Sequence, residues 1–415
     1  MDKDKKVIGI FMCNEPADPA DKVDLPMVLH EMRARKSCID KLVEQEDCVV
    51  IGILPTGDLT DENDANTPLT EESKRSILEQ VRLCDEVVIQ KEFATSKYTR
   101  YLLITCKMLG KPVRTVNKNA ELKDYENKVK PSKADKPKAK RAPIIGIVGK
   151  NAPDFDDNDN QLNHSTYMTV KKGLISAFNT HECTPIVIMS NQAGDPVKNY
   201  VENEWRSRTP SLEEQERLIQ QIEMCDFVFI QGGVEGEAYE CWVAEYCHKH
   251  NIPCAGVCEG AYCLIRALDG KIFRLAEGKT EEETKQIKQK HDSVIAGVRN
   301  AHTAKAVAGS TIEKLVGSEP FMVNSWHGRC MKKEGIASTS MSVEAYDDEG
   351  HVEICADSSR TMYLGIQFHP EVDYKTNKVS ALLISRIIET AKKNMIKKEK
   401  LRKKNVKHNA SGIIA

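Results

Sequence analysis

An internal repeat constrains the fold of this chain more than any other feature of its sequence. Residues 83–90, LCDEVVIQ, match residues 224–231, MCDFVFIQ. The same offset, continued without a gap, pairs Tyr98 with Tyr239 and Pro112 with Pro253. The chain has 415 residues, which is more than a single hydrophobic core usually serves. We therefore interpret it as two related halves that follow one another.

Both halves alternate short apolar runs with stretches of helical periodicity. Residues 48–54 and 184–189 are apolar almost throughout, which is typical of strands buried on both faces. Residues 213–223 and 238–250 have helical spacing. This alternation predicts an α/β fold: a doubly wound, mostly parallel sheet with flanking helices (flavodoxin-like), preceded by a truncated α/β copy of the same half-fold. In such sheets the chemistry takes place at the carboxyl ends of the strands.

The predicted boundaries follow from composition. Residues 1–117 form the truncated repeat, and residues 118–141 form a linker rich in Lys and Pro, with too few large apolar side chains to bury a core. Residues 142–394 form the second, complete domain. Residues 395–415 form a basic C-terminal tail.

The charge balance and the distribution of apolar residues limit which partners and which cellular compartment are expected. The 60 basic and 62 acidic side chains leave a net charge of -2, so no strong field attracts nucleic acid or a membrane surface. Only the basic tail hints at a nucleic-acid contact. Neither a signal peptide nor a membrane-spanning run of ~18 apolar residues is evident, so we expect a cytoplasmic protein with its 14 cysteines as thiols.

Cys258 has the surroundings of a nucleophile. An apolar strand pattern runs into Gly256-Val-Cys258-Glu-Gly260, and a helical pattern follows. A sharp turn from strand to helix needs small residues on both sides of the nucleophile, and it places the sulfur at a helix N-terminus, where the thiolate is favoured. Cys254 and Cys263 lack this glycine framing and are expected to be buried core residues.

A second motif supplies a base for that nucleophile. The strand pattern that begins at Tyr363 ends in His369-Pro-Glu371. Side chains two positions apart on an extended segment share a face. Glu371 can therefore fix the tautomer of His369, which then exchanges a proton with Cys258. The sequence predicts a Cys258, His369, Glu371 catalytic triad.

These two motifs together resemble the class I glutamine amidotransferase-like superfamily. Within it, the stretch from Asp226 to Gly233, the segment from His302 to His327 and the hairpin-like segment from Val343 to Cys355 resemble the gamma-glutamyl-GABA hydrolase group. The resemblance covers most of residues 142–394. It implies hydrolysis of a small gamma-glutamyl amide through a thioester on Cys258, without a metal or an organic cofactor.

The resemblance also assigns supporting residues. The backbone N–H groups of Gly233 and Glu259 would hold the oxyanion. Tyr239, Tyr262 and His327 would line the substrate pocket.

Several positions depart from the family pattern. The group usually has a basic residue after the nucleophile, a glutamine four positions beyond it and a pair of histidines near the pocket; the departing residues here are Glu259, Tyr262, Gly328 and Arg329, together with Glu235 and Glu237 after the glycine pair. These positions shape recognition, so the reaction type is better specified than the substrate. The leaving amine stays open.

The first half lacks counterparts of the predicted catalytic residues. At the repeat offset Asn117 occupies the place of Cys258, and Lys91 and Glu92 replace the glycine pair. We expect this copy to be catalytically silent and to have a structural or regulatory role, with a homodimer as one possible assembly.

Two other functions remain open from the sequence. One is a glutaminase subunit that delivers ammonia to a separate synthetase. The other is a non-catalytic interaction protein that keeps the fold. His164, His181, His248 and His250 show no metal-ligand spacing, so no metal site is expected.

Overall fold

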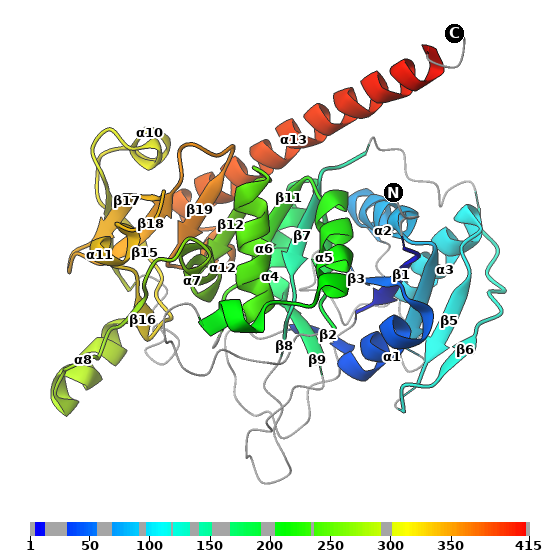
Figure 1. Cartoon of the computed structure of the whole chain (residues 1–415), viewed down its shortest axis with the longest axis horizontal. Coiled ribbons are helices and arrows are strands. Elements are labelled where there is room, and N and C mark those ends of the chain that lie inside the picture. Colours follow the sequence, from blue (N-terminus) through cyan, green and yellow to red (C-terminus); the bar gives the residue numbers. More distant parts are fainter. Residues whose placement is uncertain are drawn as a thin grey trace.

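The structure is a computed structural model of the chain, and it describes residues 5–12, 31–55, 69–90, 97–117, 119–132, 141–151, 167–191, 204–233, 236–291 and 301–411. A single 14-stranded sheet passes through both halves, with helices packed on its faces (Figure 1). The predicted α/β class is therefore confirmed.

The first half contains a parallel block of strands. Its elements are β1 (Val7–Phe11), β2 (Glu31–Arg35), α1 (Lys36–Glu46), β3 (Val49–Ile53), α2 (Glu71–Leu83), β4 (Glu86–Gln90), α3 (Lys97–Leu109), β5 (Val113–Val116) and β6 (Leu122–Asp124). The parallel strands lie in the order β3-β1-β4-β5, and β6 adds to β5 in antiparallel fashion. Part of the predicted linker is therefore an edge strand, because residues 122–124 pair with the last strand of the half.

The second half repeats this order and extends it. Its first elements are β7 (Ile144–Val148), β8 (Lys150–Asn151), β9 (Tyr167–Lys171), α4 (Lys172–Asn179), β10 (Thr184–Ile188), η4 (Glu204–Arg208), α5 (Leu212–Met224), β11 (Phe227–Ile230), α6 (Ala238–Lys249), β12 (Cys254–Val257) and α7 (Glu259–Arg266). The parallel block runs β10-β7-β11-β12-β19, which places the topological switch between β7 and β11. The doubly wound, flavodoxin-like order follows from this arrangement.

The rest of the second half carries an antiparallel extension. Its elements are β13 (Phe273–Arg274), α8 (Glu281–His291), β14 (His302–Ala306), α10 (Thr311–Val316), β15 (Phe321–Val323), β16 (Arg329–Cys330), α11 (Lys333–Ile336), β17 (Ser342–Asp347), β18 (Val352–Ala356), β19 (Tyr363–Ile366), α12 (Pro370–Asp373) and α13 (Lys378–Ser411). Strands β18, β17, β14 and β15 continue the sheet beyond β19, each antiparallel to its neighbour. The expected hairpin between Val343 and Cys355 is β17–β18.

The two halves join through equivalent elements. β3 pairs with β10 in antiparallel fashion, with Gly52 opposite Val187, and β2 pairs with β9 in the same sense. A Cβ atom on Gly52 would lie 2.7 Å from Cβ of Val187, so glycine allows this close approach. α2 packs on β10, and α5 packs on β3. The halves therefore meet about an approximate two-fold axis.

Matching hydrogen bonds accompany the matching sequences. The Gln80 side chain accepts from the Leu54 N–H at 2.7 Å and donates to the Leu54 carbonyl at 3.1 Å. The Gln221 side chain does the same with Met189, at 2.8 and 2.9 Å. Gln80 thus ties the end of β3 to α2, and Gln221 ties the end of β10 to α5.

One apolar core crosses the junction. It contains Ile8 and Val50 of the first half together with Ile145 and Phe229 of the second. The halves are therefore held by shared packing as well as by strand pairing.

The C-terminal helix includes most of the predicted basic tail. α13 runs without a break from Lys378 to Ser411. Lys398 still contacts the body, donating to the Glu223 carbonyl at 3.1 Å, and the end of α13 projects away from it (Figure 1). Among the described residues, no helix combines the length and apolar character needed to cross a membrane.

Candidate active site

Cys258 occupies the turn between β12 and α7, as the sequence predicted. Its backbone has φ 50° and ψ −115°, and a positive φ is uncommon for a residue with a side chain. The Cys258 N–H is anchored to the Ile366 carbonyl at 2.7 Å. Surrounding strands therefore hold a strained turn in place, which is typical of functional sites.

The flanking glycines are required by close packing. A Cβ on Gly260 would lie 2.1 Å from the Ile230 carbonyl oxygen, and one on Gly256 would lie 2.4 Å from the Gly260 carbonyl. Neither position has room for a side chain. This is the physical reason for the glycine framing seen in the sequence.

The structure brings His369 and Glu371 to the same place. His369 follows β19 and precedes α12, and its Nδ1 lies 2.8 Å from Oε1 of Glu371. Both side chains are almost completely buried. A Cβ on Gly232 would lie 2.7 Å from His369 Cε1 and 3.2 Å from Cys258 Cβ, so the imidazole and the thiol share the space beside this glycine.

The electrostatics of the three residues are coupled. Burial alone would lower the pKa of His369, but the Glu371 carboxylate and the interaction with the Cys258 thiol raise it to about 9. Burial favours protonation of Glu371, yet His369 and the nearby Lys171 lower the pKa of its carboxyl below the ordinary value. A charged imidazolium–carboxylate pair therefore faces the Cys258 sulfur at neutral pH.

The end of the segment from His302 to His327 also contacts the site. The Asn324 side chain accepts from the His369 N–H and donates to the His369 carbonyl, both at 2.8 Å. The Trp326 carbonyl lies 3.8 Å from the Cys258 sulfur. Asn324 thus positions the backbone of the histidine. No local sequence signal pointed to this role, because it depends on a pairing of residues 45 positions apart.

The predicted oxyanion donors come from the segments that follow β11 and β12. Glu259 is the first residue of α7, and Gly233 follows β11. A Cβ on Gly233 would be 3.1 Å from the Lys150 ammonium. Lys150 is buried and pairs with Glu240 at 2.9 Å. Burial opposes the charge on Lys150, but the Glu240 carboxylate raises the pKa of the ammonium.

The three predicted pocket residues are engaged in protein contacts. The Tyr239 hydroxyl donates to the Gly149 carbonyl. The Tyr262 hydroxyl donates to the Arg329 carbonyl at 2.7 Å. Nδ1 of His327 lies within hydrogen-bond distance of the same carbonyl, at 2.7 Å. Burial and the nearby His291 hold the pKa of the His327 imidazole well below its ordinary value.

Two departures from the family pattern pair with one another. The Glu259 side chain is 1% exposed; it accepts from Arg329 at 2.8 Å and from Arg266 at 2.7 Å. The acidic Glu259 therefore pairs with the basic Arg329, which lies where the family pattern has a pair of histidines. Glu237 caps α6, and Glu235 lies outside the described residues.

The first half has no equivalent arrangement at the corresponding turn. Asn117 follows β5 as Cys258 follows β12, but its side chain accepts from the N–H groups of Asn119 and Glu121. Lys91 and Glu92 lie outside the described residues. An amide cannot act as the nucleophile, so the described part of this half provides no counterpart of Cys258.

Comparison with known proteins gives a family match. The model of the Peptidase C26 family matches residues 233–371. The match begins at the glycine that precedes α6 and ends at Glu371, and it includes the elbow, the Asn324–His327 segment and His369.

Curated relatives match parts of the chain. A CTP synthase of Chlamydia trachomatis is 26% identical over 205 residues, which are 46% of this chain and 38% of the relative. The gamma-glutamyl-gamma-aminobutyrate hydrolase PuuD of Escherichia coli is 25% identical over 157 residues, 37% of this chain and 59% of the relative. The chain thus covers less than two thirds of either relative.

Solved structures are also similar in part. The glutaminase domain of Trypanosoma brucei CTPS has a TM-score of 0.39 and 18% identity, and covers 61% of this chain and 94% of that domain. A glutamine amidotransferase of Thermotoga maritima has a TM-score of 0.33 and 14% identity, over 63% of this chain and 86% of that protein.

Proposed function

We propose that the chain is a cysteine-dependent hydrolase of gamma-glutamyl amide bonds, because residues 233–371 match the model of the Peptidase C26 family. The observation that carries the proposal is the meeting of Cys258, on its strained turn, with the buried His369–Glu371 pair beside Gly232. A thiol next to a histidine that is oriented by a carboxylate is the arrangement of nucleophilic catalysis.

The proposed reaction has two steps. The Cys258 thiolate attacks the gamma carbonyl carbon, and a carbon–sulfur bond forms. The tetrahedral intermediate collapses when His369 gives its proton to the departing amine, leaving a gamma-glutamyl thioester. Water then attacks the thioester and His369 accepts the proton of that water. The carbon–sulfur bond breaks, glutamate is released, and the Cys258 thiolate is regenerated beside the His369 imidazolium. Glu371 keeps Nδ1 of His369 engaged, so that Nε2 handles the proton in both steps.

The charge that develops on the carbonyl oxygen needs donors. The backbone N–H groups of Gly233 and Glu259 are the proposed donors. The buried Lys150 ammonium near Gly233 adds positive potential on the same side. This arrangement favours the tetrahedral intermediate over the planar substrate, as catalysis requires.

The substrate class rests on the relatives. The Escherichia coli relative is named for gamma-glutamyl-gamma-aminobutyrate hydrolysis, and a gamma-glutamyl amide is the class that we extend to this chain. The Glu259–Arg329 pair changes the charge pattern beside the nucleophile, so the leaving amine is expected to differ from that of the relative.

The test is a comparison of the wild-type protein with Cys258→Ala. Both are incubated with a panel of gamma-glutamyl amides, and released glutamate is measured. We expect release by the wild type and a rate at least about 10³-fold lower for the variant, because nucleophile removal leaves only binding and oxyanion contributions. Equal release by the two proteins would refute the proposal.

A second candidate is a glutaminase that delivers ammonia to a separate synthetase. It is favoured by the match to a CTP synthase. Copurification of a partner that raises glutamine hydrolysis by this chain would support it. A non-catalytic role would instead be supported if Cys258 failed to react with a glutamine-like electrophile.

A further inference from the structure

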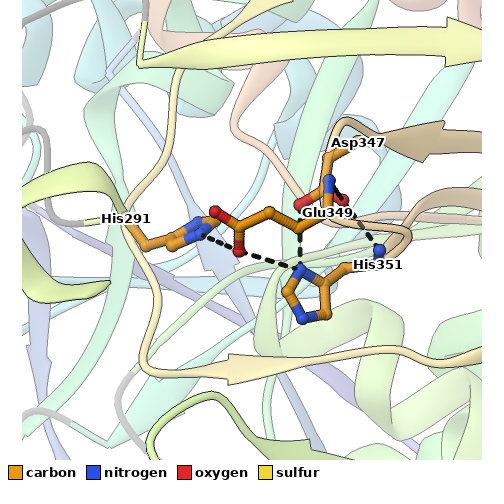
Figure 2. A group of neighbouring side chains, drawn as sticks. All are labelled: His291, Asp347, Glu349 and His351. Atoms are coloured by element: carbon orange, nitrogen blue, oxygen red, sulfur yellow. Dashed lines mark hydrogen bonds and ion pairs between the residues drawn. The ribbon is translucent and has the colours of Figure 1, made fainter. Parts of the chain in front are cut away.

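A second group of polar side chains gathers away from Cys258. Its members share the ability to donate one nitrogen or oxygen atom to a common centre, and they are His291, Asp347, Glu349 and His351. We call these four residues the hairpin cluster. Figure 2 shows their side chains converging from the end of α8 and from the turn between β17 and β18.

We propose that the hairpin cluster binds one transition-metal cation of the Zn²⁺ class. Two imidazoles and two carboxylates form a donor set that Zn²⁺ accepts in tetrahedral sites. The set carries two negative charges when the histidines are neutral, so a divalent cation would balance it. This inference does not depend on the proposed hydrolase activity.

The distances match the edges of such a site. The four ligand atoms lie within 4.8 Å of one another. His291 Nε2 and His351 Nδ1 lie 3.6 and 3.7 Å from the same Glu349 oxygen, and His351 Nδ1 lies 3.0 Å from Asp347. Bonds of ~2.0–2.2 Å in a tetrahedron put ligand atoms about 3.3–3.6 Å apart. Small side-chain shifts would complete the geometry.

One buried atom of the cluster lacks a hydrogen-bond partner. His291 is 1% exposed, and its Nε2 has no hydrogen bond. The other ring nitrogen lies 3.3 Å from the Ser325 hydroxyl, a contact that orients the ring. A buried nitrogen aimed at carboxylates without a hydrogen bond is costly, and a cation between them would remove that cost.

Hydrogen bonds orient the two carboxylates of the hairpin cluster, as is usual for metal ligands. Oδ1 of Asp347 accepts from the N–H groups of Glu349 and His351, at 2.9 and 2.7 Å, which leaves Oδ2 toward the centre. Lys290 donates a hydrogen bond to Oε1 of Glu349 at 2.5 Å. Oε2 of Glu349 therefore remains available to a cation. Hydrogen bonds of this kind to the outer atoms orient metal ligands.

The turn itself explains why three ligands come from five consecutive residues. Gly350 has φ +85°, a conformation that glycine adopts freely. It lets the side chains of Glu349 and His351 face the same point. Glu349 is 41% exposed and His351 18% exposed, so an ion can reach the centre from solvent.

The cluster is connected to the candidate active site. The His291 carbonyl accepts from the His327 N–H at 3.0 Å, and Ser325 lies within hydrogen-bond distance of both histidines. The carbonyl of Trp326, between these residues, faces Cys258. A cation that fixes His291 would therefore also steady the segment beside the nucleophile.

The test uses full-length protein without a histidine tag, stripped with a chelator. Zn²⁺ alone is titrated by calorimetry into Cys258→Ser, because a reactive thiol can also take the metal. Glu349→Gln and His351→Gln remove partly exposed ligands. Asp348→Asn is the matched control, because it removes a charge from the same turn but none of the four ligand atoms, and Lys290 keeps its contact with Glu349.

We expect one equivalent of Zn²⁺ to bind to the Cys258→Ser parent and to the Asp348→Asn control, and binding at least about 10-fold weaker in both ligand variants. Zn²⁺ should also raise the unfolding temperature of the parent and the control but not of the ligand variants. Absence of binding to the parent would overturn the proposal, and so would binding that neither ligand variant weakens.

Discussion

Glu259 illustrates how a departure from a family pattern can be internally compensated. Its carboxylate is buried between Arg329 and Arg266, so the unusual acid beside the nucleophile does not present an unpaired charge. The sequence alone showed two separate substitutions 70 positions apart. Their pairing could not be predicted, because it depends on β16 lying next to the start of α7.

Arg329→Gln is expected to lower the free energy of unfolding by about 1–3 kcal/mol, since it removes one partner of a buried carboxylate while Arg266 remains. Urea denaturation measures the change. The double variant Glu259→Gln/Arg329→Gln should lose less than the sum of the single variants, because neither charge is then left alone. Strict additivity would contradict the pairing.

The raised pKa of His369 predicts an alkaline limit of activity. With its pKa at about 9, the imidazolium that protonates the leaving amine is present at neutral pH and is lost as the pH rises through about 9. The value of kcat/KM should fall over that range. In Glu371→Gln the carboxylate no longer raises this pKa, so the fall should move to lower pH.

The pH profile of kcat/KM for the two proteins measures this difference. A conservative control is Asp348→Asn, which removes an exposed carboxylate that pairs with Lys290. A decline that stays at the same pH in Glu371→Gln would show that another group titrates.

At the scale of elements, the strand-turn-helix unit β12–Cys258–α7 was the most predictable part of the chain. Glycines on both sides of a cysteine at the end of an apolar strand are typical of a tight turn, and the close approach of Gly260 to Ile230 supplies the physical reason. The hairpin cluster could not be predicted in the same way, because His291 lies 56 positions before the nearest of its partners in the sequence and only the fold brings them together.

Gly260→Ala is expected to destabilise the fold by about 1–3 kcal/mol, because the added methyl group would meet a backbone carbonyl that cannot move independently. Gly328→Ala is the control, since a Cβ there has no atom within 4 Å. Chemical denaturation compares the two variants. Similar stabilities would argue against the tight elbow.

At the scale of the whole molecule, the sequence predicted two related halves but not how they join. A repeat shows that two segments share a fold, whereas the pairing of β3 with β10 depends on which sheet edges are exposed and complementary. The domain limits, the homodimer and any contact of the basic helix end remain predictions.

Deletion of residues 1–140 would expose one edge of β10 and the faces of α5 and β10 that now pack on the first half. We expect most of the truncated protein to be insoluble or aggregated, as judged by the soluble fraction and by size-exclusion chromatography. Unchanged solubility, assembly and activity would argue against a structural role for the first half.

The pairing of β3 with β10 affects the tendency of this molecule to self-associate through its sheet edges. A parallel sheet that stops at β10 would offer a row of unpaired backbone groups, which is a template for intermolecular strand addition. The first half covers part of that row within the chain, because Val187 and Ile188 of β10 pair with β3. The outer limits of the sheet are the three-residue strands β6 and β15, which offer little length for such addition. The covalently attached first half thus limits strand addition at this edge of the second half.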